Sequence, residues 1–144
     1  AKASVIAQKL SDSGQGSFQG RLAHYLCEEA DSLDASQHAD QIVSLLKQAA
    51  EALAELFYRM HLIGISHGDC KSDNFKYDQQ CWWILDLDSM QQHWSEKRAS
   101  QAHIRDLKRL FANWKADDTL YNVMLSAFAK RYGNDPVLRM AGLQ

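Results

Sequence analysis

The residues best suited to chemistry stand together in the segment His67-Gly68-Asp69-Cys70-Lys71-Ser72-Asp73-Asn74. Asp69 is a carboxylate that could accept the proton of a hydroxyl group, and Asn74 offers an oxygen ligand for a divalent cation. Phosphoryl transfer requires these two functions and little covalent chemistry from the protein. The segment therefore predicts a site where Mg²⁺ is held on nucleotide phosphates beside a proton-accepting carboxylate.

A further carboxylate is expected from the end of a nearby strand, because Mg²⁺ prefers oxygen ligands and takes only a few from protein. Residues 75–77 and 81–85 have the composition of two short strands, and the polar turn between them predicts a hairpin. Asp86 follows the second strand directly. The hairpin would bring Asp86 back beside Asn74, so both are candidate magnesium ligands.

Helical patterns surround these segments. Apolar residues recur at spacings of three and four from Ile42 to Met60, which predicts a long amphipathic helix that ends before Gly64. Two more apolar faces, at residues 104–114 and 120–128, predict helices that end near Gly133. Residues 3–9 and 21–29 have the pattern of two strands joined by a polar turn. We expect an α+β fold that is mainly helical, with two small antiparallel hairpins.

Composition narrows the class of protein. The chain has 144 residues, 46% of them hydrophobic, which suits a single folded domain. The net charge of −2 and the absence of a dense basic tract argue against nucleic acid as a partner. No apolar run approaches the roughly 20 residues that span a bilayer, and no signal peptide is recognised. The three cysteines lack zinc spacing, which favours reduced thiols in the cytosol.

The order of these motifs resembles a known superfamily. The pattern His67-Gly-Asp69-x-Lys71-x-x-Asn74 resembles the HRDLKxxN catalytic loop of protein kinases, and residues 84–88 resemble the strand leading into DFG. Gly68 stands in place of the kinase Arg, and Asp88 stands in place of the DFG glycine. Both departures look like small-molecule kinases, namely aminoglycoside phosphotransferases and the bacterial lipopolysaccharide core kinases (the Kdo and heptose kinase group).

A later helical motif favours one of these two groups. The pattern Arg105-Asp106-Leu107-x-Arg109-Leu110 follows Asp88 after only a short stretch, and it is similar to the lipopolysaccharide kinase group. The resemblance implies an ATP- and Mg²⁺-dependent kinase that acts on a sugar hydroxyl of the lipopolysaccharide inner core. An aminoglycoside- or choline-type phosphotransferase and a non-catalytic kinase-like binding module remain the alternatives.

The resemblance also implies roles for individual residues. Asp69 would be the catalytic base, and Lys71 would neutralise the transferring phosphoryl group of ATP. Asn74 and Asp86 would bind Mg²⁺, with Asp88 as an additional metal contact. Two residues would be structural, since they would set the shape of the catalytic loop: Asp106 from below, and His67 through packing and hydrogen bonds.

The resemblance divides the chain into two parts. Residues 1–34 would hold the last strands of an N-terminal lobe and the hinge, and residues 35–144 would form the C-terminal lobe. No glycine-rich phosphate loop or strand lysine stands at the required place. We therefore expect the chain to be a fragment of a longer kinase. Alone, the fragment should bind ATP poorly, and its activity in isolation is left open. The expected partner is a core sugar or another small-molecule acceptor. The expected location is the cytoplasm, with a peripheral contact to the inner membrane left open.

Overall fold

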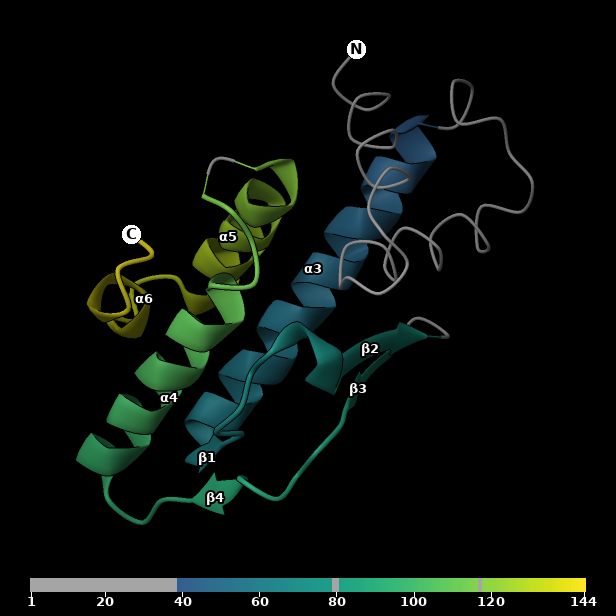
Figure 1. Cartoon of the computed structure of the whole chain (residues 1–144). Coiled ribbons are helices and arrows are strands. Elements are labelled where there is room, and N and C mark those ends of the chain that lie inside the picture. Colours follow the sequence, from purple (N-terminus) through teal and green to yellow (C-terminus); the bar gives the residue numbers. More distant parts are fainter. Residues whose placement is uncertain (1–38, 79–80, 117) are drawn as a thin grey trace.

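The structure is a computed structural model that describes residues 39–78, 81–116 and 118–144 (Figure 1). These residues form helix α3 (Ala39–Leu62), strand β1 (Ile65–Ser66), a 3₁₀ turn (Ser72–Asn74), strands β2 (Phe75–Asp78), β3 (Cys81–Ile84) and β4 (Gln91–Gln92), and helices α4 (Glu96–Phe111), α5 (Thr119–Tyr132) and α6 (Val137–Met140). The predicted α+β class is therefore confirmed. The strands expected at residues 3–9 and 21–29, and the domain 1–34 that contains them, lie outside the described residues.

Helix α3 packs against α4, α5 and the strands β1 and β3. Its stripe of apolar residues is almost completely buried, and includes Leu46, Leu53 and Phe57. The helix ends at Leu62, and Gly64 continues the chain with φ 72°, a left-handed conformation that glycine adopts without strain. Figure 1 shows α4, α5 and α6 on one side of α3 and the β2–β3 hairpin on the other. Neither α3 nor another helix in the described ranges combines the length and hydrophobicity needed to cross a bilayer.

The helices α4, α5 and α6 complete the core. Ser95 caps α4, and its side chain accepts a hydrogen bond from the amide of Arg98. Aromatic rings link the three longer helices, because Phe128 of α5 lies 5.8 Å from Phe57 of α3 and 5.1 Å from Phe111 of α4, measured between ring centroids. The core thus fixes α4 relative to α3, which matters because the candidate site lies where both helices meet the strands.

Two small antiparallel sheets place the polar segments. The predicted hairpin is present, with Phe75 opposite Ile84, and it docks on α3 through a hydrogen bond of 2.8 Å from Trp82 Nε1 to the carbonyl of Ala49. The second sheet pairs β1 with β4, which the sequence analysis did not predict. This pairing joins the chain before His67 to the chain after Asp86, and so closes the intervening segment into one compact unit.

Candidate active site

One carboxylate of α4 holds the start of the loop that follows β1. Asp106 is only 3% exposed, and its Oδ2 accepts a hydrogen bond of 2.7 Å from the backbone amide of His67. Its Oδ1 accepts a second bond, of 3.0 Å, from the amide of Gly68. A buried carboxylate is well satisfied by two such charge-assisted bonds. Asp106 therefore has the structural role that the sequence predicts.

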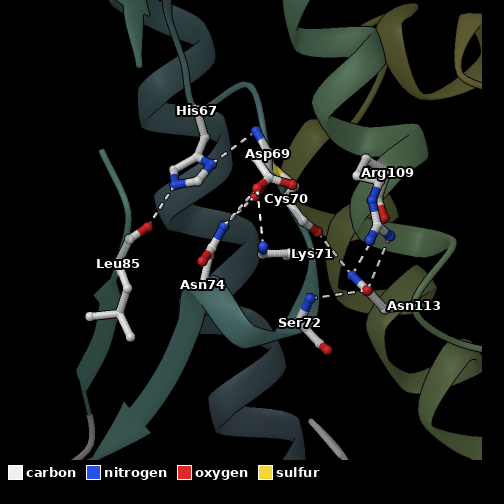
Figure 2. Close-up of polar contacts among 9 residues, drawn as sticks. All are labelled: His67, Asp69, Cys70, Lys71, Ser72, Asn74, Leu85, Arg109 and Asn113. Carbon is white, nitrogen blue, oxygen red and sulfur yellow. Dashed lines mark hydrogen bonds and ion pairs between the residues drawn. The ribbon is translucent and has the colours of Figure 1, made fainter. Parts of the chain in front are cut away.

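The ring of His67 connects the loop to the end of β3 (Figure 2). The side chain is completely buried; a bond of 2.9 Å joins Nε2 to the carbonyl of Leu85, and Nδ1 accepts a bond of 3.2 Å from the amide of Asp69. A backbone carbonyl can only accept and a backbone amide can only donate, so the proton lies on Nε2. His67 thus fixes the loop's shape.

Three of the predicted site residues contact one another. Asn74 Nδ2 donates to the backbone carbonyl of Asp69 at 2.8 Å and lies 3.4 Å from Asp69 Oδ2. The ammonium of Lys71 lies 3.5 Å from the same Oδ2 (Figure 2). These contacts use Asp69 Oδ2 and Asn74 Nδ2. The second side-chain oxygen of Asp69 and the amide oxygen of Asn74 are therefore the atoms that remain for ligands.

The β2–β3 hairpin returns the chain to this loop, as the sequence predicts. The amide of Leu85 donates to the carbonyl of Asn74 at 2.8 Å, and the carbonyl of Leu85 bonds the His67 ring. Asp86 comes next, with φ 55°, a left-handed conformation that is uncommon outside glycine and that turns the chain away from the strand. Asp86 and Asp88 are both exposed. Their metal-binding roles stay predictions.

The donor set fits a magnesium ion that is shared with phosphates. Asn74 offers an amide oxygen and Asp86 a carboxylate, which are hard oxygen ligands of the kind Mg²⁺ selects. Among residues 39–78, 81–116 and 118–144, no group of three His, Cys, Asp or Glu side chains could hold a metal ion by itself. Asn74 and Asp86 are thus the residues that would hold such an ion, as part of a set of ligands.

Asn113, just after α4, is a site-supporting residue that the sequence analysis missed. Its Oδ1 accepts from the amide of Ser72 at 3.0 Å and from Arg109 Nη1 at 3.2 Å, and its Nδ2 donates to the carbonyl of Cys70 at 2.9 Å (Figure 2). Asn113 therefore holds the second half of the loop, as Asp106 holds the first. An Asn after an amphipathic helix is common as a helix end, so its type alone gave no signal.

Cys70 lies inside the loop but points into the core. Its side chain is completely buried, and burial, with a further contribution from Asp106, raises the pKa of the thiol well above its ordinary value. A protonated, buried thiol is a poor nucleophile. Cys70 is therefore a packing residue of the core and not a candidate nucleophile.

A cavity of about 450 Å³ opens beside Asp69. Its lining includes Asp69, Ser89 and His93, together with Arg105 and Arg109 from α4. Lys71, Asn74 and Asp86 do not line it. Asp69 therefore faces two environments, one containing Lys71 and Asn74 and the other containing the arginines of α4.

The loop that follows the buried His67 brings together a carboxylate, a lysine and an asparagine. This arrangement is typical of phosphotransferases. The model of the lipopolysaccharide kinase (Kdo/WaaP) family matches residues 6–132. The chain belongs to this family and is a kinase with a role on lipopolysaccharide. The search of curated proteins and the search of solved structures gave no match. The family match confirms the resemblance to the Kdo and heptose kinase group.

Proposed function

We propose that this kinase transfers a phosphoryl group from ATP, with Mg²⁺, to a sugar hydroxyl of the lipopolysaccharide inner core. The observation that carries the proposal is the contact of Asp69 with both Lys71 and Asn74 in one loop, in a chain of the lipopolysaccharide kinase family. A carboxylate, a cation and an amide oxygen in this arrangement meet the needs of phosphoryl transfer, which are positioning and charge stabilisation. Family membership weighs against the aminoglycoside-type alternative.

Asp69 and Lys71 would act on the reacting groups. Because Asp69 Oδ2 is engaged by Lys71 and Asn74, Oδ1 is the atom that would accept the proton of the sugar hydroxyl. The ammonium of Lys71 would offset negative charge on the phosphoryl group during transfer. The ion pair between Asp69 and Lys71 would keep the base and the cation close together, so that both can act on the same phosphoryl transfer.

Asn74 and Asp86 would hold the metal. The amide oxygen of Asn74 is directed by the hydrogen bond that Nδ2 makes to Asp69, and Asp86 is delivered by the neighbouring strand. When bound, Mg²⁺ neutralises charge on the nucleotide phosphates. Asp88 lies two residues further along the exposed turn and would add an oxygen to the same ion.

Two isosteric substitutions in the full-length protein test these roles. Asp69→Asn should lower the turnover number by about 10²- to 10⁴-fold, the usual contribution of a positioned base, while Mg²⁺-dependent ATP binding is retained. Asp86→Asn should weaken that binding. Asp78→Asn, at the end of β2, is the control that should leave both properties unchanged. Normal turnover in Asp69→Asn would contradict the proposal.

The acceptor also bears on location. Lipopolysaccharide is a membrane lipid, so a kinase of its core would work at the cytoplasmic face of the inner membrane through a peripheral contact. Fractionation of cells that express the tagged full-length protein tests this. We expect the protein to sediment with the inner membrane and to be released by washing with high salt, because peripheral contacts of this kind are partly electrostatic.

A further inference from the structure

The cavity beside Asp69 lies where an acceptor must enter. The proposed function puts the nucleotide phosphates near Lys71, Asn74 and Asp86, and none of these residues lines the cavity. Asp69 does line it, so a hydroxyl that enters the cavity can reach the proton-accepting carboxylate without crossing the metal site. A volume of about 450 Å³ is in the range of small-molecule sites.

The cavity wall carries two guanidinium groups, and neither is paired with a carboxylate of the described residues. Arg105 and Arg109 are one helical turn apart on α4, and both are exposed. The two lining carboxylates are already engaged: Asp69 by Lys71, and Asp106 by two backbone amides. Within the described part of the chain, neither arginine forms an ion pair, and Arg109 bonds only the neutral Asn113.

We propose that the acceptor carries an anionic group, a carboxylate or a phosphate, next to the hydroxyl that is phosphorylated, and that Arg105 and Arg109 bind this group. This inference rests on the proposed function and names the substrate class of the same site. A guanidinium group suits the task, because its planar donors match carboxylate and phosphate oxygens in pairs. Arg105 and Arg109 thereby determine specificity without taking part in proton transfer.

Other residues of the cavity suit the remainder of a sugar. Ser89, Gln91 and His93 supply hydrogen-bond donors and acceptors, which sugar hydroxyls require. His93 is itself oriented by a hydrogen bond of 2.7 Å between its Nε2 and Ser66 Oγ. The anionic group on the arginines and the hydroxyls on these side chains would together fix the angle at which the reacting hydroxyl meets Asp69.

The rigid connection between α4 and the loop strengthens the argument. Arg105 precedes Asp106, whose carboxylate binds the amides of His67 and Gly68. The group that would bind the acceptor and the group that shapes the catalytic loop are therefore neighbours on one helix. An anion bound by Arg105 would lie at a fixed position relative to Asp69.

Kinetics of Arg105→Gln with matched acceptors test the inference. The acceptors are core oligosaccharide from deacylated lipopolysaccharide, the same material after reduction of its carboxyl groups, and the same material after phosphatase treatment. With the untreated acceptor, Arg105→Gln should raise the acceptor KM by about 10- to 100-fold and leave the KM for ATP unchanged. The treatment that removes the recognised anion should raise the acceptor KM of the wild type by a similar factor. The same treatment should cause no further rise in the acceptor KM of Arg105→Gln.

Controls separate a direct contact from the general charge of the helix. Arg98→Gln removes one positive charge from α4 outside the cavity, and it should leave the acceptor KM unchanged. Arg109→Gln should raise that KM in the same direction as Arg105→Gln. Calorimetry with the nucleotide-free protein and untreated core oligosaccharide should show the same loss of affinity in both cavity variants.

The outcomes distinguish this inference from the proposed function. If Asp69→Asn abolishes transfer but Arg105→Gln and Arg109→Gln keep the wild-type acceptor KM, the inference is wrong and the proposed function stands. If neither carboxyl reduction nor phosphatase treatment affects the wild-type KM, the inference is also wrong. If the wild-type protein transfers no phosphate to any core acceptor, the proposed function fails and the inference fails with it.

Discussion

The carboxylate of Asp106 accepts a hydrogen bond of 2.7 Å from the backbone amide of His67, 39 positions earlier in the chain. The loop from His67 to Asn74 therefore takes its shape from helix α4 as well as from its own sequence. The same carboxylate bonds Gly68, and the His67 ring bonds Leu85 beside Asp86. One buried acidic residue thus connects the helix, the loop and the strand that leads to the candidate metal ligand.

Removing this carboxylate should damage both fold and activity. We expect Asp106→Ala to lower the free energy of unfolding by about 2–4 kcal/mol, because one buried and one partly buried backbone amide lose their acceptor. Turnover should fall with it, since Asp69 loses its fixed position. Urea unfolding and a phosphoryl-transfer assay measure the two effects. Asp78→Ala, which removes an exposed ion pair with Lys76, should cost under about 1 kcal/mol, and an equal cost in both variants would contradict the assignment.

Gly68 should not tolerate a side chain. Its φ is 90°, and an added Cβ would lie 2.8 Å from the carbonyl oxygen of Ser89 and 2.9 Å from its Cβ. We expect Gly68→Ala to move the loop, to lower turnover by about tenfold or more and to destabilise the fold by about 1–3 kcal/mol. The close approach of Ser89 also accounts for a glycine at the position where protein kinases carry an arginine.

Gly133 provides the matched control for this glycine. It also has a left-handed φ, 56°, but an added Cβ there would meet no atom within 4 Å. Gly133→Ala should cost about 1–2 kcal/mol of backbone strain and leave turnover unchanged. Loss of turnover in both variants would show that the effect at Gly68 is not specific to the loop.

His103 should make the fold sensitive to acid. Burial and the neighbouring His61 lower the pKa of His103 from 6.5 to about 3, while its ring shares a hydrogen bond of 2.7 Å with the hydroxyl of Tyr132. Between these two values the unfolded chain binds the proton that the folded chain excludes. Stability should therefore be complete above about pH 6.5 and fall as the pH decreases, by about 1.4 kcal/mol per pH unit from this group.

Urea unfolding between pH 8 and pH 4.5 measures this dependence. His103→Gln keeps a hydrogen-bonding group beside Tyr132 but cannot take up a proton, so its stability should fall less steeply with decreasing pH than that of the wild type. Equal slopes in the two proteins would contradict the assignment to His103. The other groups that face this ring, His61, Tyr132 and Asp135, are present in both proteins.

The thiols of Cys70 and Cys81 should react at very different rates. Cys81 is exposed on β3, whereas burial and the nearby Asp106 raise the pKa of the Cys70 thiol. Iodoacetamide at pH 8 should modify Cys81 in the folded protein and reach Cys70 only after unfolding. Peptide mapping by mass spectrometry assigns each site. Equal labelling of both thiols under native conditions would show that Cys70 is not buried as described.

Much of the site could be predicted because it depends on local order along the chain. The loop from His67 to Asn74 and the hairpin that leads to Asp86 follow each other directly, and helical periodicity located α3, α4 and α5. The β1–β4 pairing could not be predicted, because each strand has two residues and β4 consists of two glutamines. Such strands have no apolar alternation, and only their tertiary partners define them.

The contacts that support the loop were predictable only in part. The motif around Asp106 gave its anchoring role through family resemblance, whereas Asn113 lay beyond the motif. The position of Asn113 under Cys70 and Ser72 depends on the length of α4 and on how α4 packs against α5, and neither is encoded near the loop. The cavity beside Asp69 could not be predicted for the same reason, since β4 and α4 meet there only in the folded chain.

The spacing between the two supports of the loop has a consequence for how this chain can vary. Asp106 and Asn113 are seven residues apart, which is close to two helical turns, so both face the loop from points separated by about 10 Å. An inserted or deleted residue between them would rotate one support away by about 100°. Homologous chains should therefore keep the length of this stretch unchanged.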